Sequence, residues 1–162
     1  MLDSLADYFE GEVLDGDNKY KCEDGEFVEA VKRCCVHSLP PVLLLHLKRF
    51  EFDFDLMKKM KVNDHCEFPL TINMAPYTVG HLERQERLAA DGGAPTASSD
   101  ADAAAAGLLY ELAGVLVHSG TADSGHYYSF IRARRSEPTG WLHFNDTLVE
   151  SFDEHDISKE CY

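Results

Sequence analysis

The sequence predicts an α+β fold whose main element is an antiparallel, twisted sheet. Residues 110–117 form an aliphatic and β-branched run that is long enough for one strand. Residues 126–132 alternate aromatic or apolar residues with polar ones, and this period of two is typical of a half-buried strand. Residues 1–9 carry leucines and aromatic residues at helical spacing, which indicates a short amphipathic helix.

Apolar runs and turn-forming residues place the other strands. Residues 42–50 are almost continuously apolar, as expected of a strand that is covered on both faces. Shorter strands are predicted over residues 65–72 and 148–152. Residues 27–37 alternate as well, and together with the turn-rich residues 10–20 they predict a two-stranded extension ahead of the sheet.

One segment has a different composition from the rest of the chain. Residues 79–107 are rich in Ala, Asp, Gly, Ser and Thr, and such small side chains bury too little surface to offset the entropy of ordering. We therefore expect a disordered insertion within one domain. A brief helix over residues 81–88 is compatible with this interpretation.

Candidate catalytic side chains lie at the ends of the central strands. Residues 119–125 form a glycine-containing loop, and His126 follows at the point where this loop meets a strand. An imidazole in such a place is held by the sheet and still reachable by substrate, which suits a general base. The next strand, residues 141–144, ends in Asn145 and Asp146. Either side chain could orient the imidazole and select its tautomer.

Composition restricts the class of protein. The chain of 162 residues is 44% hydrophobic, which suits one core rather than two. Its formal net charge of −14 disfavours binding to nucleic acid or to anionic membranes. No apolar run approaches the length of a transmembrane helix, and the start of the chain lacks a secretory leader. The five cysteines show no disulfide spacing, so we expect a reducing compartment, the cytoplasm or the nucleus.

Several motifs resemble those of a known family. The segments VHSG, SGHYYSFIR and WLHFNDTLVESFD are similar to the histidine box of the ubiquitin-specific proteases, which are papain-like cysteine deubiquitinases, and most similar to its very large members. The segments LPPVLLLHLKRFEFD and CEFPLTINMAPYT resemble the palm strands of the same family. The resemblance implies one partial catalytic domain over residues 1–162 without its thumb. It divides into partial fingers at 1–38, a palm at 39–78 and 108–162, and the insertion at 79–107.

The resemblance also implies roles for particular residues. It assigns His126 as the general base, with Asn145 or Asp146 as its orienting partner. It further assigns four residues beside the substrate: Gly120, Gly125, Tyr127 and Tyr128. The glycines would let the loop clear or cover the active-site channel, and one of the two tyrosines would line the path of the substrate's tail. The implied partners are ubiquitin, whose basic face suits an acidic chain, and ubiquitinated proteins.

The nucleophile of the family has no counterpart here. In the family the cysteine stands ahead of the fingers, in a segment rich in glycine and asparagine that opens a helix. None of the five cysteines has this context: Cys22, Cys34, Cys35, Cys66 and Cys161. We therefore expect a deubiquitinase fragment, or a shortened protein, that cleaves nothing by itself. The alternative is a non-catalytic module that binds ubiquitin.

Metal sites are not expected. The family's zinc ribbon contains Tyr-x-Cys-x-x-Cys, but here Gly25 stands three residues after Cys22. Cys34 and Cys35 are adjacent on a predicted strand, so their side chains point to opposite faces. A third hypothesis would use four other ligands to hold a hydrolytic metal: His118, Asp123, His126 and Asp146. Histidines eight residues apart across a loop are a poor ligand spacing, and we expect His118 to support the loop instead. No cofactor is expected.

Overall fold

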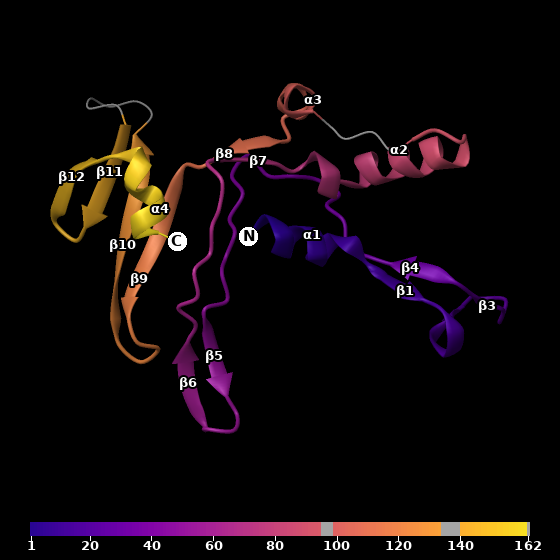
Figure 1. Ribbon diagram of the computed structural model, residues 1–162, viewed down its shortest axis with the longest axis horizontal. Coiled ribbons are helices and arrows are strands. Elements are labelled where there is room, and N and C mark those ends of the chain that lie inside the picture. The colour runs from indigo at the N-terminus through magenta and orange to yellow at the C-terminus, as the bar shows by residue number, and fades with distance from the viewer. Residues whose placement is uncertain (95–98, 134–139, 162) are drawn as a thin grey trace. The chain divides into compact units, whose positions relative to one another are not determined.

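The computed structural model describes residues 1–94, 99–133 and 140–161 (Figure 1). The chain divides into two compact units. The first consists of Met1–Val42 and Asn73–Tyr110, and the second of Leu43–Ile72 and Glu111–Tyr162. None of the helices in the described part of the chain has the length and hydrophobicity that crossing a bilayer requires.

The first unit begins with helix α1 (Leu2–Glu10), which is followed by two small antiparallel ladders. Strand β1 (Glu12–Leu14) pairs with β4 (Ala30–Lys32), and β2 (Tyr20–Lys21) pairs with β3 (Phe27–Val28). These four strands lie within the predicted two-stranded extension.

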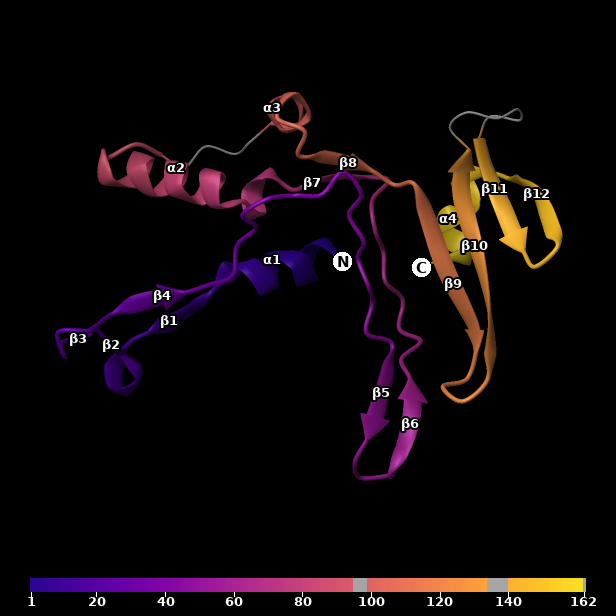
Figure 2. The ribbon, with the colours of Figure 1, turned by 180° about the vertical axis from the view of Figure 1, so that it is seen from behind.

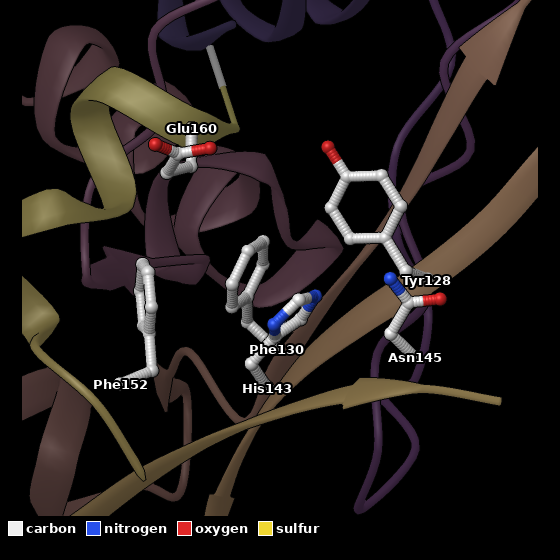
Figure 3. A pocket seen from close by; sticks show the side chains of 6 residues that line it. All are labelled: Tyr128, Phe130, His143, Asn145, Phe152 and Glu160. Atoms are coloured by element: carbon white, nitrogen blue, oxygen red, sulfur yellow. The ribbon is translucent and has the colours of Figure 1, made fainter. Parts of the chain in front are cut away.

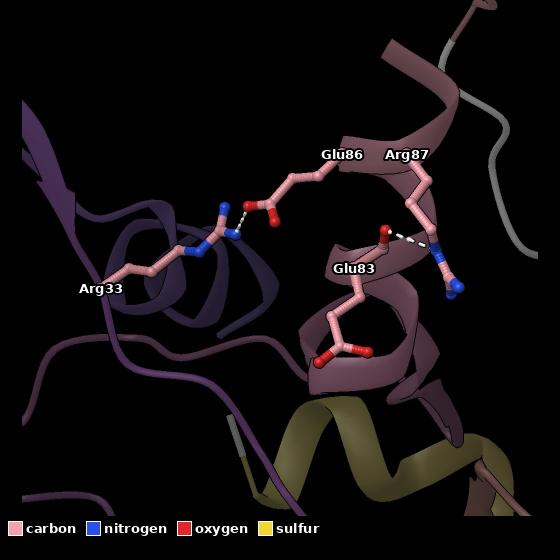
Figure 4. A network of polar contacts seen from close by, with 4 residues as sticks. All are labelled: Arg33, Glu83, Glu86 and Arg87. Atoms are coloured by element: carbon pink, nitrogen blue, oxygen red, sulfur yellow. Dashed lines mark hydrogen bonds and ion pairs between the residues drawn. The ribbon is translucent and has the colours of Figure 1, made fainter. Parts of the chain in front are cut away.

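Two contacts connect distant parts of the first unit. Phe9 of α1 stacks on Tyr77, with ring centroids 4.8 Å apart. Tyr77 ends the short 3₁₀ helix η2 (Ala75–Tyr77). Arg33, which follows β4, forms an ion pair with Glu86 of helix α2 (Val79–Ala90), as Figure 4 shows.

Helices occupy most of the segment that we expected to be disordered. Helix α2 begins at the Thr78 cap, whose hydroxyl accepts from the His81 amide, and α3 (Asp100–Ala105) begins at the Ser99 cap, whose hydroxyl accepts from the Asp102 amide. Capping side chains and alanine both favour helix, and this preference outweighs the small surface that the short side chains can bury. The expectation of disorder is thus corrected for residues 79–90 and 100–105, while residues 95–98 lie outside the described residues.

The second unit contains a four-stranded antiparallel sheet. Its strands are β9 (Gly114–Gly120), β10 (Gly125–Ala133), β11 (Gly140–Asn145) and β12 (Leu148–Phe152), in the order β12-β11-β10-β9. A hairpin of β5 (Phe50–Asp53) and β6 (Lys58–Lys61) belongs to the same unit. Strand β7 (Thr71–Asn73) pairs with β8 (Leu109–Glu111). After β12 follow the 3₁₀ helix η3 (Glu154–Asp156) and helix α4 (Ile157–Glu160), which lies against one face of the sheet (Figures 1 and 2).

The core of the second unit lies between the sheet and α4. Phe130 of β10, Trp141 of β11 and Ile157 of α4 form it, and each is at most 4% exposed. Burying a side chain of this size stabilises the fold by about 2 kcal/mol. The Trp141 indole N–H donates to Glu154 Oε2 at 2.7 Å, so the buried ring has a partner for its polar atom.

The apolar run at residues 42–50 does not form the predicted buried strand. Only Phe50 of this run belongs to a strand, and the side chains of Val42 and Leu44 are 72% and 89% exposed. A strand that is covered on both faces needs partners along its edges and layers above and below it. In the structure the Val62 amide donates to the Arg49 carbonyl at the end of this run, just ahead of β5.

Candidate active site

A histidine and an asparagine from neighbouring segments of the sheet meet at its end. His126 is the second residue of β10 and Asn145 is the last residue of β11. The imidazole Nε2 lies 2.6 Å from Asn145 Oδ1, a short hydrogen bond. A carboxamide oxygen only accepts, so Nε2 carries the proton and Nδ1 keeps a free lone pair. The side chain of His126 is 46% exposed, which leaves that lone pair open to a proton donor.

Asp146 is the more distant of the two candidate orienting residues. Its Oδ2 lies 4.0 Å from His126 Nε2, beyond hydrogen-bond distance, and its side chain is 78% exposed. The backbone at Asp146 has a φ of 51°, in the left-handed region, as the chain turns from β11 into β12. This turn keeps Asn145 in the ladder and carries the Asp146 carboxylate away from the ring.

Two glycines shape the hairpin that carries His126. Gly120 has a φ of +120°, and a Cβ there would lie 2.6 Å from Ser124 O. A Cβ on Gly125 would lie 2.1 Å from His118 Nε2 and 2.5 Å from Ser119 O. The imidazole of His118 therefore occupies the space that any larger residue before His126 would need.

His118 is a packed residue of the sheet. Its ring centroid lies 4.7 Å from that of Tyr127 and 5.1 Å from that of Phe50. Its carbonyl oxygen accepts from Lys61 Nζ at 2.7 Å, which connects β9 to β6. The expected supporting role thus agrees with the contacts. The hypothesis of a metal held by His118 and His126 disagrees with the contacts. The ring of His118 is packed against glycine and aromatic side chains, and the ring of His126 is bonded to Asn145.

The two tyrosines after His126 lie on opposite faces of β10, as alternation along a strand requires. Tyr127 is 54% exposed beside His118. Tyr128 lies on the same face as His126, with their rings 6.5 Å apart and nearly parallel. Burial raises the pKa of the Tyr128 hydroxyl, and the negative charge of Glu160 raises it further.

A pocket of about 350 Å³ lies on the Tyr128 face of the sheet. Figure 3 shows its lining, which consists of Tyr128, Phe130, His143, Asn145, Phe152 and Glu160. Sequence reasoning did not assign His143 or Glu160 to a site. Glu160 reaches the pocket only because α4 packs against the sheet, and no local sequence signal reports such a contact.

The five cysteines are free thiols. Cys34 and Cys35 are exposed, whereas Cys22, Cys66 and Cys161 are half-buried. Burial, together with the charge of Glu160, raises the pKa of the Cys161 thiol to about 11. Such a thiol is protonated at neutral pH and is therefore a poor nucleophile.

Comparison with known proteins identifies the family. The sequence model described as "Ubiquitin carboxyl-terminal hydrolase" matches residues 3–162. The chain belongs to the ubiquitin carboxyl-terminal hydrolase family. Among curated members, human ubiquitin carboxyl-terminal hydrolase 24 is 43% identical over 172 residues, which cover 98% of this chain and 6% of that protein. Mouse ubiquitin carboxyl-terminal hydrolase 9X is 38% identical over 175 residues, which cover 100% of this chain and 7% of that protein.

Solved structures of the family agree with the fold. A chain of the SAGA Ubp8/Sgf11/Sus1/Sgf73 DUB module bound to ubiquitin aldehyde matches with a TM-score of 0.67 and 29% identity, over 98% of this chain and 31% of that chain. The SAGA DUB module bound to monoubiquitin gives a TM-score of 0.68 and 30% identity, over 98% of this chain and 30% of that chain. The predicted α+β fold of ubiquitin-specific protease type is confirmed, as is the resemblance to very large family members, of which this chain spans only about 6%.

Proposed function

We propose that this chain is the histidine-bearing part of a cysteine deubiquitinase, which removes ubiquitin from protein conjugates by thiol hydrolysis. The observation that carries the proposal is the 2.6 Å contact between His126 Nε2 and Asn145 Oδ1. This contact directs the basic Nδ1 away from Asn145, where it can accept a proton from a thiol and later return it to the leaving amine. Asn145 selects the tautomer, and Asp146 adds only a distant negative charge.

The nucleophile of this reaction belongs to a part of the catalytic domain outside these 162 residues. The high pKa of the Cys161 thiol supports this assignment. The exposed run that includes Leu44 supports it as well, because another part of a catalytic domain would cover it. By itself the chain is then inactive. If no such part exists, the remaining function is ubiquitin binding without catalysis.

Ubiquitin and ubiquitinated proteins are the proposed partners. Two of the solved relatives contain ubiquitin aldehyde or monoubiquitin, and the net charge of −14 suits a basic partner. In the proposed layout the small ladders of residues 1–38 are partial fingers and the palm consists of residues 39–78 and 108–162, with the helical insertion at 79–107 between them. We propose a cytoplasmic or nuclear location from the five free cysteines.

The first experiment sequences the transcript upstream of the Met1 codon and assays the encoded protein on ubiquitin-7-amido-4-methylcoumarin. We expect an in-frame segment with a cysteine in a glycine- and asparagine-rich box, turnover by the longer protein, and none by the 162-residue chain. A transcript without such a segment would refute the hydrolase proposal. Titration of labelled ubiquitin with the chain then tests the binding alternative, and the absence of binding would refute that as well.

Asn145 and Asp146 are expected to differ in their effect on catalysis. In the active protein, Asn145→Ala should lower kcat at least about tenfold, because the imidazole loses its orienting hydrogen bond. Asp146→Ala should change kcat less than about threefold, since an exposed charge 4.0 Å away contributes little. Nitrogen NMR of the His126 ring supplies an independent measurement, in which only Asn145→Ala shifts the tautomer ratio. Equal effects of the two variants would contradict the assignment.

A further inference from the structure

We propose that Lys61 is a positioning residue for His126: it holds the β5–β6 hairpin against His118, and His118 in turn fixes the backbone that carries His126. The inference rests on the proposed function, in which His126 accepts the proton of a thiol. Lys61 precedes His118 by 57 residues in the sequence, so the link between them is a tertiary contact.

The first contact is a hydrogen bond from the hairpin to the edge of the sheet. Lys61 is the half-buried last residue of β6, and its Nζ donates to the His118 carbonyl at 2.7 Å. His118 belongs to β9, the edge strand of the four-stranded sheet, and the hairpin lies beside this strand (Figures 1 and 2). A hydrogen bond from an ammonium group is stronger than one between neutral groups. Lys61 therefore restrains the end of β9 that leads into the loop before His126.

The second contact is aromatic and involves the residue opposite Lys61. Phe50 of β5 pairs with Lys61 across the hairpin, so the two side chains lie on the same face. The rings of Phe50 and His118 meet edge to face, with centroids 5.1 Å apart. The His118 ring also contacts its cross-strand neighbour Tyr127, at 4.7 Å between centroids. Because Lys61 ties the hairpin to β9, it keeps Phe50 in contact with His118.

The orientation of the His118 imidazole depends largely on packing. Its Nδ1 is buried and has no hydrogen-bond partner among the described residues. Without a bond at this atom, the contacts with Phe50 and Tyr127 restrain the direction of the ring. Loss of the hairpin contact therefore allows the imidazole to move.

His118 transmits this restraint to His126 through Gly125. A Cβ on Gly125 would lie 2.1 Å from His118 Nε2, so the imidazole lies directly against the backbone of Gly125. Gly125 is the first residue of β10, and His126 follows it, opposite Ser119 of β9. Movement of the imidazole thus displaces the backbone that sets the 2.6 Å bond between His126 Nε2 and Asn145 Oδ1.

A short hydrogen bond to a catalytic group is sensitive to such displacement. Hydrogen bonds weaken steeply as their angle departs from linearity. A misplacement of about 1 Å in a catalytic constellation can lower the rate about a hundredfold. Lys61 thus affects the reaction through the position of His126, without contact with the substrate.

The test records nitrogen NMR of the His126 ring in the 162-residue chain with the substitution Lys61→Met, which keeps an unbranched stem and removes the donor. We expect the ratio of the Nε2–H tautomer to the Nδ1–H tautomer to fall about fivefold, because the bond to Asn145 loosens. The signal of the Trp141 indole N–H, which donates to Glu154, should stay unchanged and report an intact core. An unchanged His126 spectrum would overturn the proposal.

Two further variants of β6 make the test specific. Lys59→Met makes the same substitution at an exposed position on the same face of the strand, and the His126 spectrum should stay unchanged. Lys61→Arg keeps a cationic donor and should restore at least about half of the tautomer ratio. An equal shift in Lys59→Met, or no recovery in Lys61→Arg, would contradict the positioning role.

Kinetics of the active protein separate positioning from substrate binding. Lys61→Met should lower kcat about tenfold and leave KM within about twofold, since Lys61 acts on His126. Lys59→Met should change neither constant. A raised KM at unchanged kcat would overturn the proposal, because Lys61 would then act on substrate binding. If the unmodified protein hydrolyses nothing, the hydrolase proposal fails, and the NMR comparison, which needs no nucleophile, decides whether Lys61 positions His126.

Discussion

His126→Ala is expected to reduce hydrolysis of ubiquitin-7-amido-4-methylcoumarin by the active protein at least about a thousandfold. In the proposed mechanism the substitution removes the group that forms the thiolate and later protonates the leaving amine, and general acid–base catalysis contributes on the order of 10²–10⁴ in rate. Affinity for ubiquitin should stay unchanged, so the loss should appear in kcat. The measurement is a steady-state progress curve together with calorimetric binding of ubiquitin.

His155→Ala is the matched control for this variant. It removes an exposed imidazole from the 3₁₀ helix η3, where the backbone amide of His155 donates to Asp153 Oδ1. Its activity should equal that of the unmodified protein. If His126→Ala retained more than about a tenth of the activity, His126 would not be the general base.

Gly125→Ala should lower the free energy of unfolding by about 1–3 kcal/mol, the range that is typical of overpacking. The new Cβ would lie 2.1 Å from His118 Nε2 and 2.5 Å from Ser119 O, so the hairpin must open. Activity should fall with it, because His126 is the next residue. Urea denaturation followed by circular dichroism measures the change in stability.

Two comparisons make the Gly125 prediction specific. Gly80→Ala lies in α2 with no atom within 4 Å of its new Cβ, and it should stabilise the protein by up to about 1 kcal/mol. The double variant with His118→Ala should recover part of the loss but not all of it, because the contact with the Ser119 carbonyl remains. Additive effects of the two substitutions would show that His118 does not confine Gly125.

Patterns in the sequence predicted that the strands of the main sheet exist, but they predicted less well the residues at which these strands begin and end. The run at residues 110–117 was expected to be one strand, but the structure ends β8 at Glu111 and starts β9 at Gly114. The break is tertiary in origin. The Leu112 amide donates to Leu70 O and the Ala113 carbonyl accepts from the Arg132 amide, so these two residues bond to different partners.

Sequence patterns singled out His126, Asn145 and Asp146 as candidates, and the structure places His126 in contact with Asn145. Alternation along β10 and the polar end of β11 were sufficient to name His126 with Asn145 or Asp146. The choice between the last two depends on the left-handed backbone of Asp146, with a φ of 51°, which single-sequence patterns do not report. Long-range packing was invisible in the same way, so Glu160 and His143 were missed as pocket residues.

The exposed apolar run that contains Val42 and Leu44 has a thermodynamic consequence. Any segment or protein that covers it acts as a ligand of the folded state, and it stabilises that state by RT ln(1 + [L]/Kd). At a concentration one hundred times the dissociation constant this amounts to about 2.7 kcal/mol. The free energy of unfolding of the 162 residues then depends on the concentration of the covering partner, and the melting temperature should rise with that concentration.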